Sequence, residues 1–291
     1  MSKMEVTGYT RLAGLIAKPA KHSISPLMHN AAFKANNIDA VYLAFEIEKE
    51  QLAAMMKSIT ALNMIGVNVS MPYKRAVLPY LDELSEAATL TGAVNTVLPQ
   101  KDGRLVGHNT DGSGFMRSLV DSKIAIIGEE ITVIGTGGAA TAICVQAALD
   151  GVKKINVFNR QGKFFYQKQQ KINEIEKKTQ CKLSLTDLAD VKAVNKALRN
   201  SKLLVNATDV GMKPNEAQTP IQDFSALHND LAVYDVIYNP RKTKLIQIAN
   251  EKGLKTVNGL GMLLYQGAYA FELWTGKKMP LEIVKPLVAN S

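Results

Sequence analysis

Lys74 and Asp111 are the residues of this chain whose types are best suited to proton transfer. Lys74 ends the segment Gly66–Lys74, and Asp111 stands within Gly107–Gly112. A lysine can donate or accept a proton near a reacting oxygen, and a carboxylate beside it can orient it. A third polar segment, Gly92–Thr96, lies between them in the sequence. We interpret the three segments as candidates for one polar site.

A glycine-rich turn, Gly135–Ala139, follows these segments. It comes after a short apolar run and before an alanine-rich stretch. A strand–turn–helix of this kind lets the backbone approach a pyrophosphate and points the positive end of the helix at the phosphates. A simple turn, with glycines kept for packing, is the alternative. With Lys74 and Asp111, a dinucleotide cradle indicates proton transfer coupled to hydride transfer.

Short apolar runs that alternate with helical spacing predict the elements that position these residues. Strands are expected over residues 12–17, 41–47, 66–70, 131–134, 155–158, 203–206 and 231–235. Helices are expected over residues 26–33, 48–62, 73–84, 139–149, 187–198, 261–274 and 280–288. Ser25 should cap the first helix, with Pro26 at its first position. The alternation predicts parallel or largely parallel sheets.

Composition predicts a globular protein of one large or two ordinary domains, with 291 residues, 46% of them hydrophobic and 21% charged. Two cysteines fit neither a disulfide framework nor a metal-ligand spacing, which predicts a reducing compartment, the cytoplasm, and no metal. We expect no signal peptide and no membrane span.

The net charge is +9, and much of the excess falls between Lys153 and Lys202. This charge is either a solvated basic surface or an attraction for anionic small molecules. Stacking aromatic residues do not interleave it, which argues against nucleic-acid binding.

Several motifs follow one another along the chain. They are Lys21–Asn30, Asn68–Lys74, Gly92–Thr96, Asn109–Gly112, Asn206–Thr208, Gly211–Met212, Tyr238–Pro240 and Gly259–Ala268. In this order they resemble the shikimate dehydrogenase family, and more closely its quinate/shikimate dehydrogenase branch. The resemblance runs from Gly14 to about Pro280.

The resemblance implies two α/β domains. Residues 1–110 and 260–291 would form the substrate-binding and catalytic domain, and residues 111–259 a Rossmann domain with a doubly wound parallel sheet. The C-terminal helices would return to the substrate domain. The sequence does not determine the oligomeric state, and a homodimer is one assembly that the protein could form.

The implied reaction is reversible hydride transfer between shikimate and 3-dehydroshikimate, with NAD or NADP, on the route to chorismate and the aromatic amino acids. Quinate could also serve as substrate. A quinate-preferring or amino-shikimate-type dehydrogenase is one alternative, and a non-catalytic dinucleotide-binding regulator is another.

The resemblance also implies roles for individual side chains. Ser23 and Ser25 would hold the substrate carboxylate, although Ser25 could serve only as a helix cap. Lys74 and Asp111 would be catalytic, with Lys74 the leading acid/base. The implied substrate contacts are Ser23, Ser25, Ser70, Lys74, Asn95, Asp111, Tyr238 and Gln266. Asn68 would instead stabilise the loop that carries Ser70.

The implied cofactor contacts lie in the second domain. They are Gly135, Thr136, Gly137, Gly138, Ala139, Asn159, Arg160, Gln161, Gly162, Asp209, Gly211, Met212, Val236, Ile237, Tyr238, Asn239 and Gly259. Part of the branch has a lysine where this chain has Asp209.

The pattern after the second strand of that domain bears on the choice of cofactor. Arg160 favours NADP, with a surface arginine as the alternative. Gln161 replaces the threonine of the NADP-preferring pattern, and Gly162 replaces the aspartate of the NAD-preferring one. The pair Phe164–Phe165 resembles the NAD-preferring branch. On balance these residues favour NAD.

Overall fold

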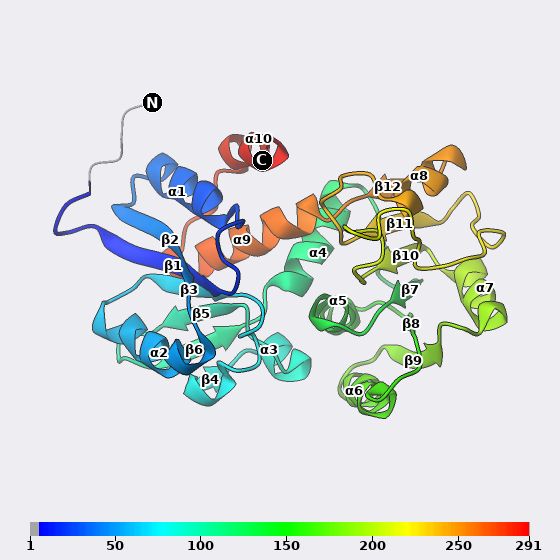
Figure 1. Cartoon of the computed structure of the whole chain (residues 1–291), viewed down its shortest axis with the longest axis horizontal. Coiled ribbons are helices and arrows are strands. Elements are labelled where there is room, and N and C mark those ends of the chain that lie inside the picture. The colour runs from blue at the N-terminus through cyan, green and yellow to red at the C-terminus, as the bar shows by residue number, and fades with distance from the viewer. Residues whose placement is uncertain (1–5, 291) are drawn as a thin grey trace. The chain divides into compact units, whose positions relative to one another are not determined.

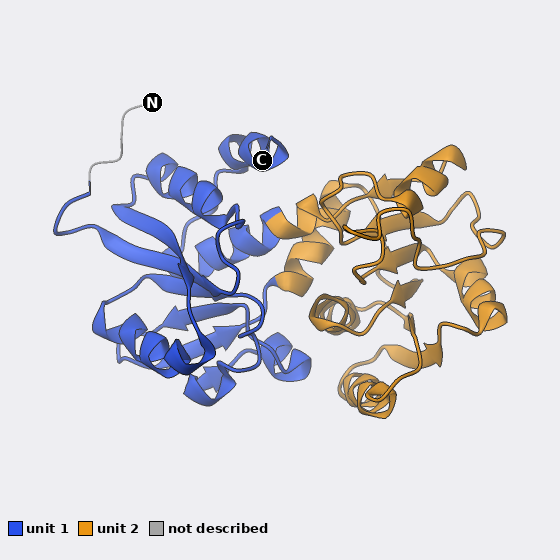
Figure 2. Cartoon of the chain, viewed as in Figure 1, with its two compact units in different colours: residues 1–110, 264–291 blue, residues 111–263 orange. Residues whose placement is uncertain are grey.

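The structure, a computed structural model, describes residues 6–290. The chain forms two compact units, coloured separately in Figure 2. Unit 1 comprises Met1–Thr110 and Leu264–Ser291, and unit 2 comprises Asp111–Leu263. Each unit contains one sheet of six strands (Figure 1).

The sheet of unit 1 is mixed, with the strand order β2-β1-β3-β5-β6-β4. Its strands are β1 (Arg11–Ala17), β2 (Ala40–Glu46), β3 (Gly66–Val69), β4 (Glu83–Leu84), β5 (Thr96–Pro99) and β6 (Leu105–His108). β1 pairs in parallel with β2 and β3, and β4 with β6. β5 runs antiparallel to both of its neighbours. The expectation of a largely parallel sheet therefore holds, with β5 as the reversed strand.

The helices of unit 1 include the end of the chain. They are α1 (Ser25–Ala35), η1 (Lys49–Gln51), α2 (Leu52–Ala61), η2 (Leu78–Tyr80), α3 (Glu86–Thr91), α9 (Leu260–Thr275), which begins in unit 2, and α10 (Leu281–Ala289). The indole of Trp274 donates to the carbonyl of Val97 at 3.1 Å, and α10 contacts α1. A Cβ at Gly66 would overlap this indole, so glycine lets α9 pack closely on β3. The C-terminal helices thus return to unit 1, as predicted.

The sheet of unit 2 is parallel throughout, with the order β12-β11-β10-β7-β8-β9. Its strands are β7 (Glu130–Ile134), β8 (Lys154–Asn159), β9 (Lys182–Asp187), β10 (Leu203–Asn206), β11 (Ala232–Asp235) and β12 (Thr256–Val257). Its helices are α4 (Asp111–Asp121), α5 (Gly138–Leu149), α6 (Phe165–Lys178), α7 (Val191–Asn200) and α8 (Lys244–Glu251). This strand order is that of a Rossmann sheet, and it confirms the predicted fold class.

Three local expectations were wrong. Residues 73–84 form turns, η2 and β4 rather than a helix, because Pro79 has no N–H and its ring clashes with the preceding turn of a helix. Asp187 ends β9, and α7 starts only after Asp190, whose carboxylate caps it by accepting from the N–H of Ala193 at 2.9 Å. Ser25 is the first residue of α1, and Ile24 occupies the N-cap position.

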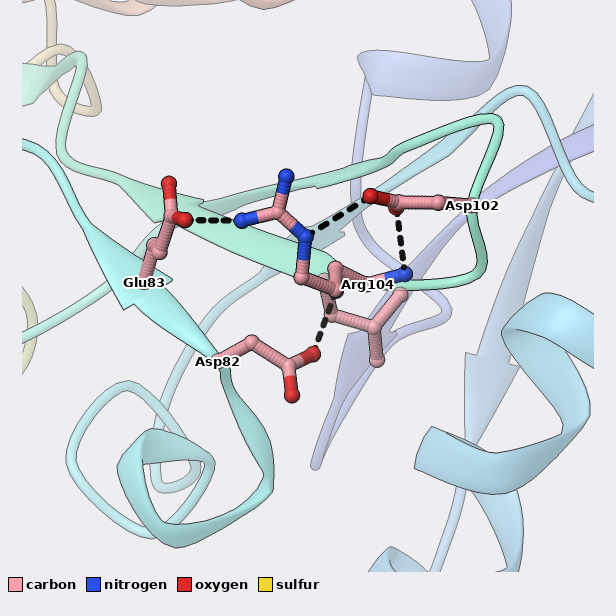
Figure 3. Close-up of polar contacts among 5 residues, drawn as sticks. Asp82, Glu83, Asp102 and Arg104 are labelled. Carbon is pink, nitrogen blue, oxygen red and sulfur yellow. Dashed lines mark hydrogen bonds and ion pairs between the residues drawn. The ribbon is translucent and has the colours of Figure 1, made fainter.

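Polar side chains at the β4–β6 edge of unit 1 tie these two strands together (Figure 3). The Asp82 carboxylate accepts from the N–H of Leu105 at 2.7 Å. The Arg104 guanidinium donates to Asp102 at 2.8 Å and also bonds Glu83. These ion pairs are exposed, so water screens them and their contribution to stability is small. Among the described helices, none is long and apolar enough to cross a membrane.

Candidate active site

Asn68 lies at the centre of a buried polar network in unit 1. Its side-chain carbonyl accepts from the hydroxyl of Tyr42 at 2.8 Å. Its amide nitrogen donates to the backbone carbonyl of Asn95 and to the hydroxyl of Thr96, both at 3.1 Å. All of these side chains are buried. Asn68 therefore connects β2, β3 and the start of β5.

Asn95 continues the network towards the C-terminal helix. Its side-chain carbonyl accepts from the N–H of Thr110 at 2.8 Å. Its amide nitrogen donates to the hydroxyl of Thr110 at 3.0 Å and lies 3.4 Å from the side-chain carbonyl of Gln266. The Thr110 hydroxyl also bonds the backbone carbonyl of Gln266 at 3.0 Å. Asn95 and Gln266, both predicted substrate contacts, are thus brought together across 171 residues of sequence.

The two proposed catalytic residues occupy different surroundings. Lys74 is half-buried in a turned segment, and its backbone carbonyl accepts from the N–H of Val94 at 2.8 Å. This bond ties the turn to the segment that carries Asn95. Asp111 is 9% exposed and begins α4, directly after Thr110. A carboxylate in the first turn of a helix is stabilised by the helix dipole.

The predicted carboxylate-binding serines lie at the N-terminal end of α1. The N–H of Ser25 donates to the hydroxyl of Ser23 at 3.2 Å. Ser25 is buried, and its side chain hydrogen-bonds Tyr42. Burial raises the pKa of Tyr42, and the bond to Ser25 partly opposes this rise. Tyr42 therefore links Ser25 to Asn68 and stays a neutral phenol.

Tyr42 was missed from the sequence. The signal available was a tyrosine within an apolar strand, since a buried phenol usually finds a hydrogen-bond partner. The ring of His29 stacks on it, with the centroids 4.4 Å apart. Burial lowers the pKa of His29 to about 3, so the imidazole is neutral at physiological pH.

Ser70, another predicted substrate contact, directly follows β3. Its side chain is half-buried, and its N–H donates to the backbone carbonyl of Ile16 at 2.9 Å.

The glycine turn of unit 2 has the geometry of a phosphate cradle. Gly135 has a φ of 111°, and a Cβ there would lie 2.8 Å from the carbonyl of Ala207. Packing therefore accounts for this glycine. Gly137 and Gly138 differ, because a Cβ at either position would meet nothing within 4 Å. Fold and packing do not require glycine at those two positions, whereas a pyrophosphate lying on the N-terminus of α5 would.

The end of β8 lies beside the glycine turn. The hydroxyl of Thr136 donates to the side chain of Asn159 at 3.0 Å. The amide of Asn159 in turn donates to the backbone carbonyl of Arg160 at 2.7 Å. Gln161 and Gly162, which follow, are exposed like Arg160. Ala139 lies in the first turn of α5.

The remaining predicted cofactor residues follow β10, β11 and β12. Asp209 and Met212 are exposed, and the N–H of Met212 donates to the backbone carbonyl of Asp209 at 3.0 Å. Gly211 between them has a φ of 108°, which favours glycine. A Cβ at Gly259 would overlap the carbonyl of Val236. After Val236, Ile237 is buried, Tyr238 is 45% exposed and Asn239 is exposed.

The fold and these sites define a class of protein. Unit 2 is a Rossmann-type nucleotide-binding unit with its glycine turn after the first strand. Unit 1 holds buried amides and hydroxyls suited to a small polyhydroxylated ligand. Such a chain is a two-unit α/β protein of the dinucleotide-binding class.

Comparisons with known proteins narrow this class. Residues 15–97 match the family model "Shikimate dehydrogenase substrate binding domain", and residues 259–288 match "Shikimate 5'-dehydrogenase C-terminal domain". The chain is 50% identical over 283 residues to a shikimate dehydrogenase (NADP(+)) of Listeria monocytogenes, covering 97% of each chain. It is 49% identical to that of Streptococcus uberis, covering 98% of this chain and 97% of the relative.

Solved structures agree with these sequence matches. A crystal structure of shikimate 5-dehydrogenase from Listeria monocytogenes in complex with shikimate and NAD has a TM-score of 0.95 at 49% identity, with 99% of each chain covered. Quinate dehydrogenase from Corynebacterium glutamicum in complex with NAD has a TM-score of 0.86 at 30% identity, covering 97% of this chain and 99% of the other. The chain belongs to the shikimate dehydrogenase family. It is an NAD(P)-dependent oxidoreductase, and the family predicted from the motifs is confirmed.

Proposed function

We propose that this chain catalyses the reversible oxidation of shikimate to 3-dehydroshikimate, with Lys74 and Asp111 handling the hydroxyl proton. The observation that carries the proposal is the convergence of Asn95 and Gln266, whose side chains meet in the buried network of unit 1. Amide groups both donate and accept, so they suit the hydroxyls of a ring substrate. The family membership supports the same reaction.

Lys74 would act on the oxygen that loses its proton. In the oxidative direction, the neutral amine of Lys74 accepts the hydroxyl proton; in the reductive direction, the ammonium returns it to the carbonyl oxygen. The ammonium also stabilises negative charge that develops on this oxygen. Asp111 would orient the lysine. When bound, the nicotinamide accepts or returns the hydride.

Ser23 and Ser25 would bind the carboxylate of the substrate. Both hydroxyls can donate, and the N-terminus of α1 adds its positive end. The hydrogen bonds that involve Ser25, Tyr42 and Asn68 join this region to the amide network. Ser70 and Tyr238 would complete the substrate contacts.

The Ser23→Ala variant should show mainly a binding defect. Loss of one hydroxyl donor to a carboxylate should raise the KM for shikimate about tenfold and leave kcat within about threefold, since charged hydrogen bonds contribute about 1.5–3 kcal/mol. Steady-state kinetics measures both constants. A variant with a lowered kcat and an unchanged KM would contradict carboxylate binding by Ser23.

We further propose NAD as the preferred cofactor. The curated relatives carry NADP(+) in their names, and the Listeria monocytogenes structure binds NAD, so the family accommodates both. The exposed Arg160 and Lys163 are the cations nearest in sequence to the end of β8. These two cations, with no carboxylate between them at Gly162, would suit the 2′-phosphate of NADP. The preference for NAD is proposed instead from the pair Phe164–Phe165, which resembles the NAD-preferring branch, and from the NAD bound by the Listeria monocytogenes relative.

Steady-state kinetics with shikimate and quinate, each with NAD and NADP, tests substrate and cofactor together. We expect the highest kcat/KM with shikimate and NAD. A higher value with quinate would support the quinate-preferring alternative, and inactivity with all four pairs would support the non-catalytic regulator. A strong preference for NADP would indicate that Arg160 or Lys163 binds the 2′-phosphate. We also propose that the protein is located in the cytoplasm and that it forms a homodimer.

A further inference from the structure

Asp235 ends β11 in the centre of a second buried polar cluster, in unit 2. The carboxylate is fully buried, as are its partners Asn206 and Thr243. One carboxylate oxygen accepts from the amide of Asn206 at 3.0 Å and from the N–H of Ile237 at 3.1 Å. The other accepts from the hydroxyl of Thr243 at 2.7 Å. Burial raises the pKa of Asp235, and these three donors act in the opposite direction.

The cluster shapes the loop that follows β10. Asn206 donates to the backbone carbonyl of Val210 at 3.2 Å. Its side-chain carbonyl accepts from the N–H of Thr208 at 3.1 Å and from the Thr208 hydroxyl at 2.7 Å. A Cβ at Gly211 would touch Thr243 at 3.4 Å. The backbone of residues 207–212 is therefore held from within by partners of Asp235.

The same carboxylate shapes the turn after β11. Its bond to the N–H of Ile237 fixes the turn, and the carbonyl of Ile237 accepts from the N–H of Gly259 at 3.1 Å. Thr243 also caps α8, since its hydroxyl accepts from the N–H of Ile246 at 3.3 Å. One buried carboxylate thus joins the ends of β10 and β11 to the start of α8.

The position of this cluster in the sheet indicates what it serves. In a Rossmann sheet the dinucleotide lies across the carboxyl ends of the strands. The turn after β7 would take the pyrophosphate and the end of β8 the adenosine ribose, which leaves the ends of β10 and β11 for the nicotinamide half. We propose that Asp235 is a positioning residue for the nicotinamide half of the cofactor, acting through residues 207–212 and 236–238. This proposal rests on the proposed NAD(P)-dependent function and on the cofactor contacts predicted from the sequence in these two loops.

A carboxylate is suited to this role because its three partners are all donors. Asp235 is 0% exposed, so it acts through the loops rather than by touching the cofactor. In Asp235→Asn, the side chain keeps its volume, and its oxygen can still accept from Asn206 and from the N–H of Ile237. Its NH₂ group must face Thr243, whose hydroxyl then has to accept instead of donating, and the bonds no longer gain from the charge of a carboxylate.

Binding measurements with two ligands distinguish a positioning role of Asp235 from a role in the general stability of unit 2. The full chain is titrated with NADH and with ADP-ribose, which lacks the nicotinamide, and Kd is measured for each. NADPH and 2′-phospho-ADP-ribose are used instead if the parent chain prefers NADP. Asp235→Asn should raise the Kd of the dinucleotide about tenfold and change that of the fragment by less than about twofold.

The matched control is Thr132→Val. It removes another buried hydrogen bond of unit 2, in which the hydroxyls of Thr132 and Ser201 lie 2.8 Å apart, away from the carboxyl ends of the strands. Both dissociation constants should stay unchanged in this control. If Asp235→Asn does not fold, Thr243→Val, which removes one donor to the carboxylate, should show the same selective loss.

An equal loss of both ligands, or no loss of either, would overturn the positioning role. A separate variant tests whether the glycine turn binds the cofactor at all. Gly137 has an extended backbone with open space at its Cβ, so Gly137→Val should fold and should bind ADP-ribose weakly. Unchanged ADP-ribose binding in Gly137→Val would refute the cradle itself, whatever Asp235→Asn does.

Discussion

Replacement of Lys74 with alanine should lower kcat by two to four orders of magnitude, while the KM for shikimate changes by less than about tenfold. General acid–base catalysis contributes about 10²–10⁴-fold. The variant loses the group that accepts or returns the hydroxyl proton, and it also loses the charge that stabilises the developing alkoxide. Following nicotinamide absorbance at saturating cofactor and shikimate measures kcat directly.

Arg75→Ala is the control for this variant. Arg75 is the next residue in the same turn and is exposed, so its loss removes a neighbouring cation without removing a proposed catalytic group. Its kcat should remain within about twofold of the parent value. If Lys74→Ala retains more than about a tenth of the parent kcat, the acid/base assignment of Lys74 is wrong.

Replacement of Asn68 with alanine should destabilise unit 1 by about 3 kcal/mol and raise the KM for shikimate. The Tyr42 hydroxyl, the Asn95 carbonyl and the Thr96 hydroxyl would each lose a buried partner. Leaving a buried polar group unsatisfied costs about 1–3 kcal/mol, and such losses within one network are not additive. The KM rises because Asn95, a proposed substrate contact, loses part of its support.

The single tryptophan makes this measurement specific to one unit. Trp274 is buried in unit 1 and donates to β5. Its fluorescence during urea unfolding therefore reports the free energy of unfolding of unit 1. Tyr42→Phe is the comparison, because it removes one donor to Asn68 together with the bond to Ser25 and should cost less, about 1–2 kcal/mol. An unchanged urea midpoint in Asn68→Ala would show that the network does not stabilise this unit.

The amino-acid sequence was sufficient for the class of fold and the family. Periodicity alone located β1, β3, β7, β10 and α5 to within two residues, because strands buried on both faces are continuous apolar runs. The glycine turn was recognised because it stands between an apolar strand and an alanine-rich helix. The motifs then predicted the family, which the comparisons confirmed.

Local pattern was insufficient where a distant partner decided the structure. Residues 73–84 have helical spacing; Pro79 already argued against a helix, but only the structure shows that residues 83–84 pair with the distant β6. A tyrosine in an apolar strand predicts that its phenol has a hydrogen-bond partner, but the partners of Tyr42, Ser25 and Asn68, come from other elements and are not identified by the strand itself. In the sequence, Asp235 is only the last residue of an apolar strand; the structure shows that three donors surround its carboxylate.

The residue types for proton transfer, carboxylate binding and phosphate binding were thus determined by the sequence itself, because chemistry depends on functional groups and the motifs retain them in order. The tertiary structure decided which of these groups share hydrogen bonds. Asn95 meets Gln266 only because α9 returns to unit 1, where Gly66 lets Trp274 pack against β3. Buried polar groups must satisfy one another, and folding alone selects their partners.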